Sequence, residues 1–305
     1  MTDHQAAHRR FRTAARASFA AAVALASLGA SPPARADEPS PPRLKDSQHF
    51  TVDPVVDSVV TVGGLTFAGL LDLIVGTGEI RPGPPGDPGK LLWIDRGAVT
   101  QTIDPDAGVR SDWALRAVEL YALLDPILSG VRDGRRALLV DAVLYAESIS
   151  VIQLFTGMTK IAVRRPRPID YAQCSSAAAP GNDCADTDLQ LSFFSGHAST
   201  SGAITGTAAY LAFVRHGARS PRPWITLGVG AAMTAFISYE RVRSGAHFPT
   251  DVIMGSLAGA AIGVLVPHLH RRPHFHDQEL ETPPVLIGFA PLPGSGGSLT
   301  VTARF

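Results

Sequence analysis

Apolar residues recur at helical spacing through most of the chain. In each stretch they fall three or four positions apart, which predicts helices that turn one face toward a shared core. Strand-like alternation is nearly absent before the last residues. The sequence therefore predicts an all-α fold, a helical bundle of about six core helices. The predicted helices span residues 55–76, 112–128, 135–163, 197–214, 224–239 and 250–268.

The last residues follow a different pattern. Apolar and polar residues alternate over 298–305, and residues 285–289 form a second short apolar run. Proline and glycine fill the segment 291–297 between them, as in a turn between two strands. We therefore expect one short C-terminal β-hairpin in an extension of residues 276–305, after a helical domain of residues 51–275.

The first residues have the pattern of a targeting segment. Four arginines between residues 9 and 16 precede a short apolar run, and Ala-Arg-Ala stands at 34–36. This predicts a signal peptide at 1–36, cleaved before a proline-rich linker at 37–50. An uncleaved membrane anchor is the alternative, although the apolar run is short for a span of about 20 residues. We expect an exported protein, periplasmic or in the cell-envelope membrane, with its active site outside the cytoplasm.

Charge and hydropathy narrow the choice of partners. The formal net charge is +0, so the chain offers no basic surface for nucleic acid. Three predicted helices hold uncharged runs of 16 or 17 residues, close to the length of a membrane span. Earlier helices carry Arg116, Glu119, Asp141 and Glu147, which are costly in lipid. A soluble bundle with a small-residue core explains both features, and membrane association is the alternative.

The two cysteines, Cys174 and Cys184, stand ten positions apart. In an oxidising compartment such a pair is a disulfide candidate. Two free thiols are the alternative. No pair of histidines lies nearby, so the cysteines do not indicate a zinc site.

The first chemical motif is basic. Lys160 lies near the end of a predicted helix, and Arg167 follows between two prolines that end it. Lysine supplies a point charge and arginine a planar fork, and both suit a phosphate group. Arg164 and Arg165 add to the positive field. Alternatively, these residues only complement the negative end of a helix dipole.

The second motif, Phe194-Ser195-Gly196-His197, opens a predicted helix. Ser195 is placed to cap the helix, and the free backbone amides that follow can bind an anion. Gly196 lets the backbone approach that anion closely. His197 stands where it can give a proton to a leaving oxygen.

The third motif contains Arg241, His247 and Asp251. Asp251 lies four residues after His247, so its carboxylate can accept one ring N–H and leave the other nitrogen free to attack. Arg241 adds another fork for phosphoryl oxygens. Alternatively, Asp251 stabilises the start of a helix beside a structural histidine.

Together the motifs read Lys-x6-Arg-Pro, Ser-Gly-His and Arg-x5-His-x3-Asp, from Lys160 to Asp251. This arrangement resembles the signature of the superfamily of type 2 phosphatidic acid phosphatases (PAP2) and vanadium haloperoxidases. The resemblance implies an all-helical core and makes His247 the nucleophile, Asp251 its orienting partner and His197 the general acid. By the same resemblance, the phosphate-binding residues are Lys160, Arg167, Ser195, Gly196 and Arg241.

Two positions depart from the family pattern. Phe194 stands where the family has proline, and Glu240 stands where it has serine. Phe194 is expected to alter only the wall of the loop. Glu240 would repel a phosphate unless it pairs with Arg243 or turns away, so its position bears on substrate class and efficiency.

We therefore expect a metal-independent phosphatase that hydrolyses phosphomonoesters, either lipid phosphates or small esters, through a phosphohistidine intermediate. No metal site and no cofactor are expected, because three cationic side chains take the place of a metal pair. Vanadate is expected to inhibit. The alternatives are a vanadium-dependent haloperoxidase, for which vanadate would be the cofactor, and a soluble periplasmic acid phosphatase of broad specificity. A non-catalytic helical module is disfavoured, because all six reacting and binding side chains are present.

Overall fold

The computed structural model describes residues 49–77, 85–174, 184, 186–272, 285–292 and 296–303. The chain divides into two units, Met1–His270 and Arg271–Phe305, and each is described by itself. The predicted signal peptide and most of the predicted linker lie outside the described residues.

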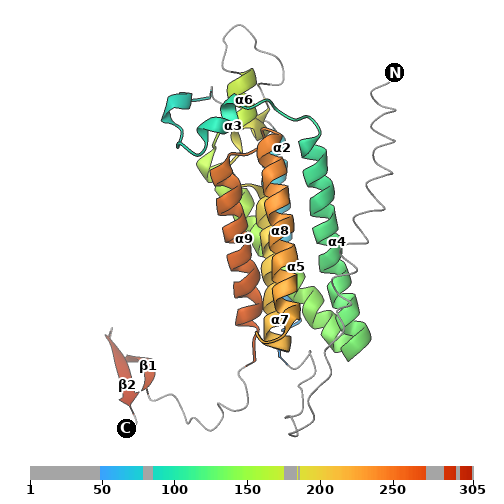
Figure 1. Cartoon of the computed structure of the whole chain (residues 1–305). Coiled ribbons are helices and arrows are strands. Elements are labelled where there is room, and N and C mark those ends of the chain that lie inside the picture. Colours follow the sequence, from blue (N-terminus) through green and yellow to red (C-terminus); the bar gives the residue numbers. More distant parts are fainter. Residues whose placement is uncertain are drawn as a thin grey trace. The chain divides into compact units, whose positions relative to one another are not determined.

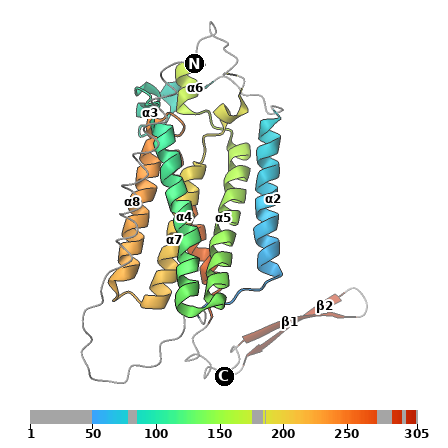
Figure 2. The same ribbon diagram turned by 90° about the vertical axis from the view of Figure 1, so that its right-hand side faces the viewer.

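The first unit is a bundle of long helices that run side by side (Figures 1 and 2). Short helices gather at one end of it. The all-α bundle expected from the hydrophobic pattern is confirmed, because each predicted helix corresponds to one long helix. The long helices are α2 (Val56–Gly76), α4 (Ala107–Asp133), α5 (Arg135–Val163), α7 (Gly196–His216), α8 (Pro221–Arg243) and α9 (Pro249–Leu269). The short ones are η2 (Pro88–Lys90), α3 (Arg96–Thr100), α6 (Pro168–Gln173) and η4 (Thr187–Gln190).

Local sequence explains where the long helices begin and end. Gly134 adopts a positive φ of 89° between α4 and α5, a conformation that favours glycine. Ser220 caps α8 by accepting a hydrogen bond from the backbone of Arg222, and Pro221 fills the first position of that helix. Pro249 occupies the same position in α9.

Small residues bring α7 and α9 into backbone contact. A Cβ atom added at Gly259 would lie 1.9 Å from the carbonyl oxygen of Ser199, and one at Gly263 would lie 2.1 Å from that of Ala203. Neither position can hold a larger residue unless the helices separate. The close approach also fixes the helix starts: the backbone N–H of Ser195 donates to the carbonyl of Asp251 at 3.2 Å.

The main hydrophobic core lies among α4, α5, α7 and α8. It contains fully buried side chains such as Leu144 and Ile237, and Phe50 packs against it with 0% exposure. Phe50 was predicted to end the linker, so the folded unit begins before residue 51.

The outer faces of the bundle are apolar. In the described part of the chain, three helical stretches are long and apolar enough to cross a membrane: α2, Arg135–Gln173 and α9. Along α2, whose residues are all described, only Asp57 is buried, while Leu65, Phe67 and Leu70 are exposed. A soluble bundle would cover such a face. The structure therefore favours membrane association over the expected soluble bundle.

The described part of the second unit is a pair of strands, β1 (Val285–Leu292) and β2 (Gly296–Ala303). They pair antiparallel, with Val285 opposite Ala303 and Leu292 opposite Gly296. β1 extends three residues beyond its predicted end.

Candidate active site

The three motifs meet at one end of the bundle. Lys160 lies in the last turn of α5, and Arg241 lies in the last turn of α8. His197 lies in the first turn of α7, and His247 lies in the loop that leads into α9. Arg167 directly precedes α6. These residues interact electrostatically across the site, as the sequence motifs predicted.

His247 is buried, with 1% of the residue exposed, and its orientation is set by the backbone. The Nδ1 atom lies 2.7 Å from the carbonyl oxygen of Ser192. A carbonyl can only accept, so Nδ1 carries the proton and Nε2 keeps a lone pair. Burial lowers the pKa of this imidazole well below its usual value, and the positive charges of Arg167, Arg241 and Lys160 lower it further. The ring is therefore neutral at neutral pH.

Asp251 does not hydrogen-bond to His247, which corrects the predicted direct contact. Its Oδ2 atom lies 4.0 Å from His247 Nδ1. The same oxygen accepts hydrogen bonds from the hydroxyl of Ser192 and from the backbone N–H of Phe248, the latter at 2.9 Å. Asp251 thus holds the two segments that flank His247, and Ser192 supplies the direct contact. Sequence reasoning missed Ser192 because a backbone acceptor leaves no signature in residue type.

Arg165 holds Asp251 and the His247 loop in place. Its guanidinium donates to Asp251 and, at 2.8 Å, to the buried carboxylate of Asp95. It also lies over the ring of Phe248, 4.1 Å from the ring centre. Asp95 in turn accepts from the hydroxyl of Thr250 at 2.7 Å. Arg165 is therefore a structural clamp on the His247 loop. The expectation that it only adds to the phosphate field does not describe this role.

His197 has an acidic partner that the sequence did not reveal. Its Nε2 atom lies 2.8 Å from Oδ1 of Asp112, on α4. The same carboxylate oxygen lies 3.6 Å from Arg241. Burial and the positive charge of Arg241 lower the pKa of His197 to about 4, and the hydrogen bond to Asp112 offsets part of that shift by favouring the protonated ring. Asp112 falls 85 residues before His197, so only the packing of α4 against the site shows the pair.

The arginines offer donors that the protein leaves unused. Arg167 donates to Asp188 at 2.6 Å through one terminal nitrogen. The Nε atoms of Arg167 and Arg241 are buried without a hydrogen-bond partner among the described residues. An unpaired buried donor is costly, so both positions suit a ligand that accepts hydrogen bonds. Phosphate oxygens are such acceptors.

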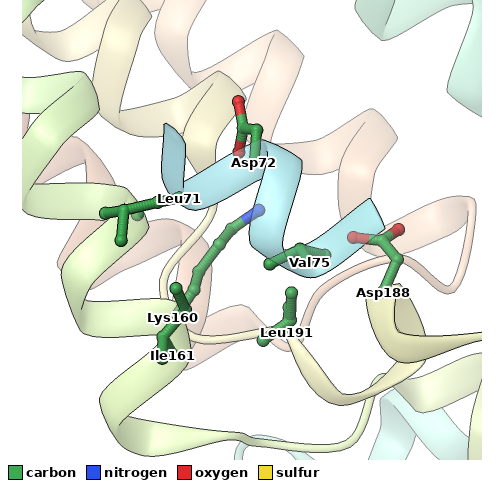
Figure 3. Close-up of a pocket in the computed structure, with 8 residues that line it drawn as sticks. Leu71, Asp72, Val75, Lys160, Ile161, Asp188 and Leu191 are labelled. Atoms are coloured by element: carbon green, nitrogen blue, oxygen red, sulfur yellow. The ribbon is translucent and has the colours of Figure 1, made fainter. Parts of the chain in front are cut away.

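Lys160 lies in a small pocket between α2 and α5 (Figure 3). Figure 3 shows its side chain reaching across the pocket toward α2, with Leu71 and Asp188 on opposite sides. Asp188 also pairs with Arg167, so the pocket adjoins the arginine cluster. The pocket is lined by Leu71, Asp72, Val75, Gly157, Lys160, Ile161, Asp188 and Leu191.

The second motif forms the predicted helix start. Ser195 precedes α7, and its hydroxyl accepts a hydrogen bond from the N–H of Ala198 at 3.4 Å. A Cβ atom at Gly196 would meet only the methyl group of Thr156, at 3.8 Å. The fold itself therefore does not require glycine at this position.

The two unusual residues turn away from the phosphate site. Glu240 is buried and pairs with Arg110 of α4, at 2.7 Å and 2.9 Å, in place of the expected Arg243. Its charge is therefore compensated inside the bundle. Phe194 packs with Ile152 and Ala203 in a second apolar cluster, so it belongs to the core more than to the loop wall.

Cys174 and Cys184 form the predicted disulfide. Cys174 follows directly after α6, the helix that Arg167 precedes, and Cys184 lies four residues before Asp188. The bridge therefore ties together the two segments that carry the Arg167–Asp188 pair.

Part of the chain, which contains this site, is similar to a known protein family. Residues 141–275 match the model of the PAP2 superfamily. All predicted catalytic and phosphate-binding residues, from Lys160 to Asp251, lie within that stretch. The match confirms the resemblance inferred from the three motifs.

The chain is also similar to two individual proteins. Phospholipid phosphatase 1 of Rattus norvegicus is 30% identical over 144 residues, which are 42% of this chain and 50% of that protein. The chain thus spans half the length of this curated relative. A crystal structure of a transmembrane PAP2-type phosphatidylglycerolphosphate phosphatase from Bacillus subtilis aligns over 74% of this chain and 97% of that one. The two share 16% identity with a TM-score of 0.41.

Proposed function

We propose that this protein is a phosphatase that hydrolyses lipid phosphomonoesters through a phosphohistidine at His247. One observation carries the proposal. The buried His247 has its Nδ1 proton committed to Ser192, which leaves Nε2 as a nucleophile among cationic groups with unused donors. Phosphoryl transfer needs this combination of positioning and positive charge.

In the first half-reaction, Nε2 of His247 attacks phosphorus, and the bond from phosphorus to the ester oxygen breaks. Arg167, Arg241 and Lys160 neutralise the charge that spreads over the phosphoryl oxygens. His197 gives its proton to the departing alkoxide, which leaves as an alcohol. Asp112 supports this step, because its hydrogen bond favours the protonated ring of His197 against burial and Arg241, which lower the pKa of that ring to about 4.

In the second half-reaction, a water molecule attacks the phosphohistidine. His197, now neutral, takes the proton from that water, and the bond from phosphorus to Nε2 breaks. Inorganic phosphate is released and both histidines return to their starting states. The hydrogen bond from Nδ1 of His247 to Ser192 persists throughout and stabilises the positive charge on the phosphorylated ring.

We propose that no metal takes part in this reaction. The cationic side chains supply the charge that a metal pair supplies in other phosphatases. Three carboxylates near the reacting groups have protein partners: Asp112 binds His197, Asp188 binds Arg167, and Asp251 binds Arg165. The groups left available at the site are therefore cationic hydrogen-bond donors, which suit an anion.

The apolar surroundings support a lipid as substrate. Lys160 shares its pocket with Leu71 and Val75 of α2, a helix whose other apolar side chains are exposed. A phosphate headgroup can bind at the arginines while an acyl chain lies along α2. The curated relative is a phospholipid phosphatase, which agrees with this choice. It does not favour the vanadium-dependent haloperoxidase, and the exposed apolar helices do not favour a soluble acid phosphatase.

The proposed organisation follows from the sequence. A signal peptide at residues 1–36 and a linker that ends before Phe50 precede the phosphatase domain, which extends to residue 275, and a hairpin extension at 276–305 follows. The disulfide near the active site supports an oxidising compartment, so we place the site outside the cytoplasm.

The test is phosphate release by detergent-solubilised protein in EDTA, from p-nitrophenyl phosphate and from a short-chain phosphatidate. Wild type is expected to turn over both, with vanadate inhibiting, and His247→Ala is expected to be inactive. His268→Gln, at the far end of α9, is the matched control and should retain activity. Failure of wild type to release phosphate in EDTA, with recovery on adding a metal, would overturn the metal-independent mechanism.

The lipid assignment has a separate test. Val75→Gln places a polar group in the wall of the Lys160 pocket without touching the reacting residues. The variant should lose turnover of phosphatidate several-fold and keep that of p-nitrophenyl phosphate. Equal loss for both substrates, or for neither, would count against an acyl chain lying along α2.

A further inference from the structure

A second polar cluster lies inside the apolar bundle, away from the active site. Asp57 comes from the first turn of α2, Glu147 from α5, and His270 directly follows α9. His270 and Asp251 lie at opposite ends of α9, roughly 28 Å apart at the rise of a helix. Asp57 and Glu147 are buried, with 5% and 7% of each residue exposed.

The three side chains converge on one point. Nε2 of His270 lies 3.2 Å from Oδ1 of Asp57 and 3.4 Å from Oε2 of Glu147. The ligand atoms of all three residues lie within 4.8 Å of one another. No cluster of sequence motifs indicates this group, because its members are separated by 90 and 123 positions.

The histidine is oriented so that its free nitrogen faces the carboxylates. Its Nδ1 atom lies 2.8 Å from the carbonyl oxygen of Val266, so Nδ1 carries a proton. Metal-binding histidines make this kind of second hydrogen bond, which fixes the tautomer and directs the other nitrogen at the ion.

The cluster has more negative charge than its protein partners compensate. Two buried carboxylates face one imidazole, and a proton on Nε2 can serve only one of them well. Asp57 makes that hydrogen bond with His270 and also accepts from the backbone of Asp53. Oε2 of Glu147 is buried with no hydrogen-bond partner among the described residues. A buried carboxylate oxygen left this way is satisfied by a proton or by a further positive group such as a metal ion.

We propose that Asp57, Glu147 and His270 bind a divalent first-row transition metal such as Zn²⁺. One imidazole nitrogen and two carboxylate oxygens form a donor set that Zn²⁺ accepts, with water as the fourth ligand. Around a tetrahedral ion with bonds of about 2.0–2.2 Å, ligand atoms stand about 3.3–3.6 Å apart. The two separations from His270 match this spacing. The ion joins α2 to α5 and to the residue that directly follows α9.

The test uses full-length protein in detergent, stripped of metal with EDTA and dialysed against Zn²⁺. Wild type should bind one more Zn²⁺ per chain than Glu147→Gln, and Zn²⁺ should raise the Tm of wild type only. Glutamine keeps the shape of glutamate and removes the uncompensated charge, so the stripped variant should fold as well as stripped wild type. His268→Gln, two positions from His270, is the matched control and should bind Zn²⁺ as wild type does.

A second measurement uses wild type alone, so it does not depend on whether the variant folds. Stripped wild type loaded with Co²⁺ should show visible ligand-field absorption, which Zn²⁺ should abolish. Equal Zn²⁺ binding by wild type and Glu147→Gln, or no such absorption, would leave only a buried ion-pair triad and overturn the proposal. Failure of this metal proposal can be distinguished from failure of the phosphatase proposal. If catalysis required a metal, the Glu147→Gln variant would still require that metal for activity.

Discussion

The Nδ1 atom of His247 lies 2.7 Å from the carbonyl oxygen of Ser192 and 4.0 Å from the nearer carboxylate oxygen of Asp251. The contact that fixes the His247 ring is thus a backbone carbonyl, and the carboxylate acts one step away. Asp251 holds Ser192 and Phe248, and Arg165 holds Asp251. The reactivity of His247 therefore depends on how firmly its loop is positioned.

This geometry predicts a graded effect of substitutions. Asp251→Asn should lower kcat by about 10- to 100-fold, because outer partners of a reacting group commonly contribute this much. His247→Ala should abolish turnover. Ser192→Ala keeps the backbone carbonyl and loses only the hydroxyl, so it should cost less than Asp251→Asn. Steady-state kinetics with p-nitrophenyl phosphate would check the order, and Asp251→Asn as inactive as His247→Ala would contradict it.

The pair of Asp112 and His197 predicts a dependence on the leaving group. Asp112→Asn should slow hydrolysis of an alkyl phosphate by about 10-fold, since a poor leaving group needs the proton that His197 supplies. p-Nitrophenolate needs no such proton, so its release should change little. Glu119→Gln, farther along the same helix, is the matched control. Equal loss with both substrates would indicate that Asp112 only supports the fold.

The environment of His247 predicts its ionisation state. Burial lowers the pKa of the imidazole, so the ring stays neutral as the pH falls through 6.5, where an ordinary histidine gains its proton. NMR of ¹⁵N-histidine-labelled protein at pH 6 should show a neutral ring protonated at Nδ1, and this signal should vanish in His247→Gln. An imidazolium signal for His247 at that pH would contradict the prediction.

The contact between α7 and α9 predicts a strict demand for glycine. Gly259→Ala places a methyl group 1.9 Å from the backbone of Ser199, so the helices must separate and both Tm and activity should fall. Gly69→Ala on α2 is the matched control, because a Cβ there meets nothing within 4 Å. It should be neutral or stabilising by up to about 1 kcal/mol. A neutral Gly259→Ala would disprove the close packing.

The helices and the site differ in how far sequence predicts them. Helical spacing of apolar residues gives the long helices, and the bounds of α5 agree to the residue with the predicted range 135–163. Lys160, Arg167 and His197 were found because their types and spacing form motifs. Asp112 and Asp95 were not, since each reaches the site through packing between distant segments.

Two further features depend on three-dimensional surroundings. Apolar composition alone does not decide whether the bundle is soluble or membrane-embedded. The exposed apolar face of α2 in the structure favours the membrane. From the sequence alone, Glu240 is expected to repel a phosphate unless it pairs with Arg243 or turns away. Its partner is Arg110, which lies far from it in the chain, so the sequence does not indicate the pair.

The central claim is that the phosphoryl group passes through His247. The most direct measurement is rapid acid-free quenching of the enzyme with ³²P-labelled substrate, followed by analysis of the protein-bound label. The account predicts label that is stable to alkali and lost in acid, as expected for phosphohistidine, located on the peptide that contains His247 and absent from His247→Ala. Efficient turnover with no protein-bound label, or with label retained in His247→Ala, would contradict it.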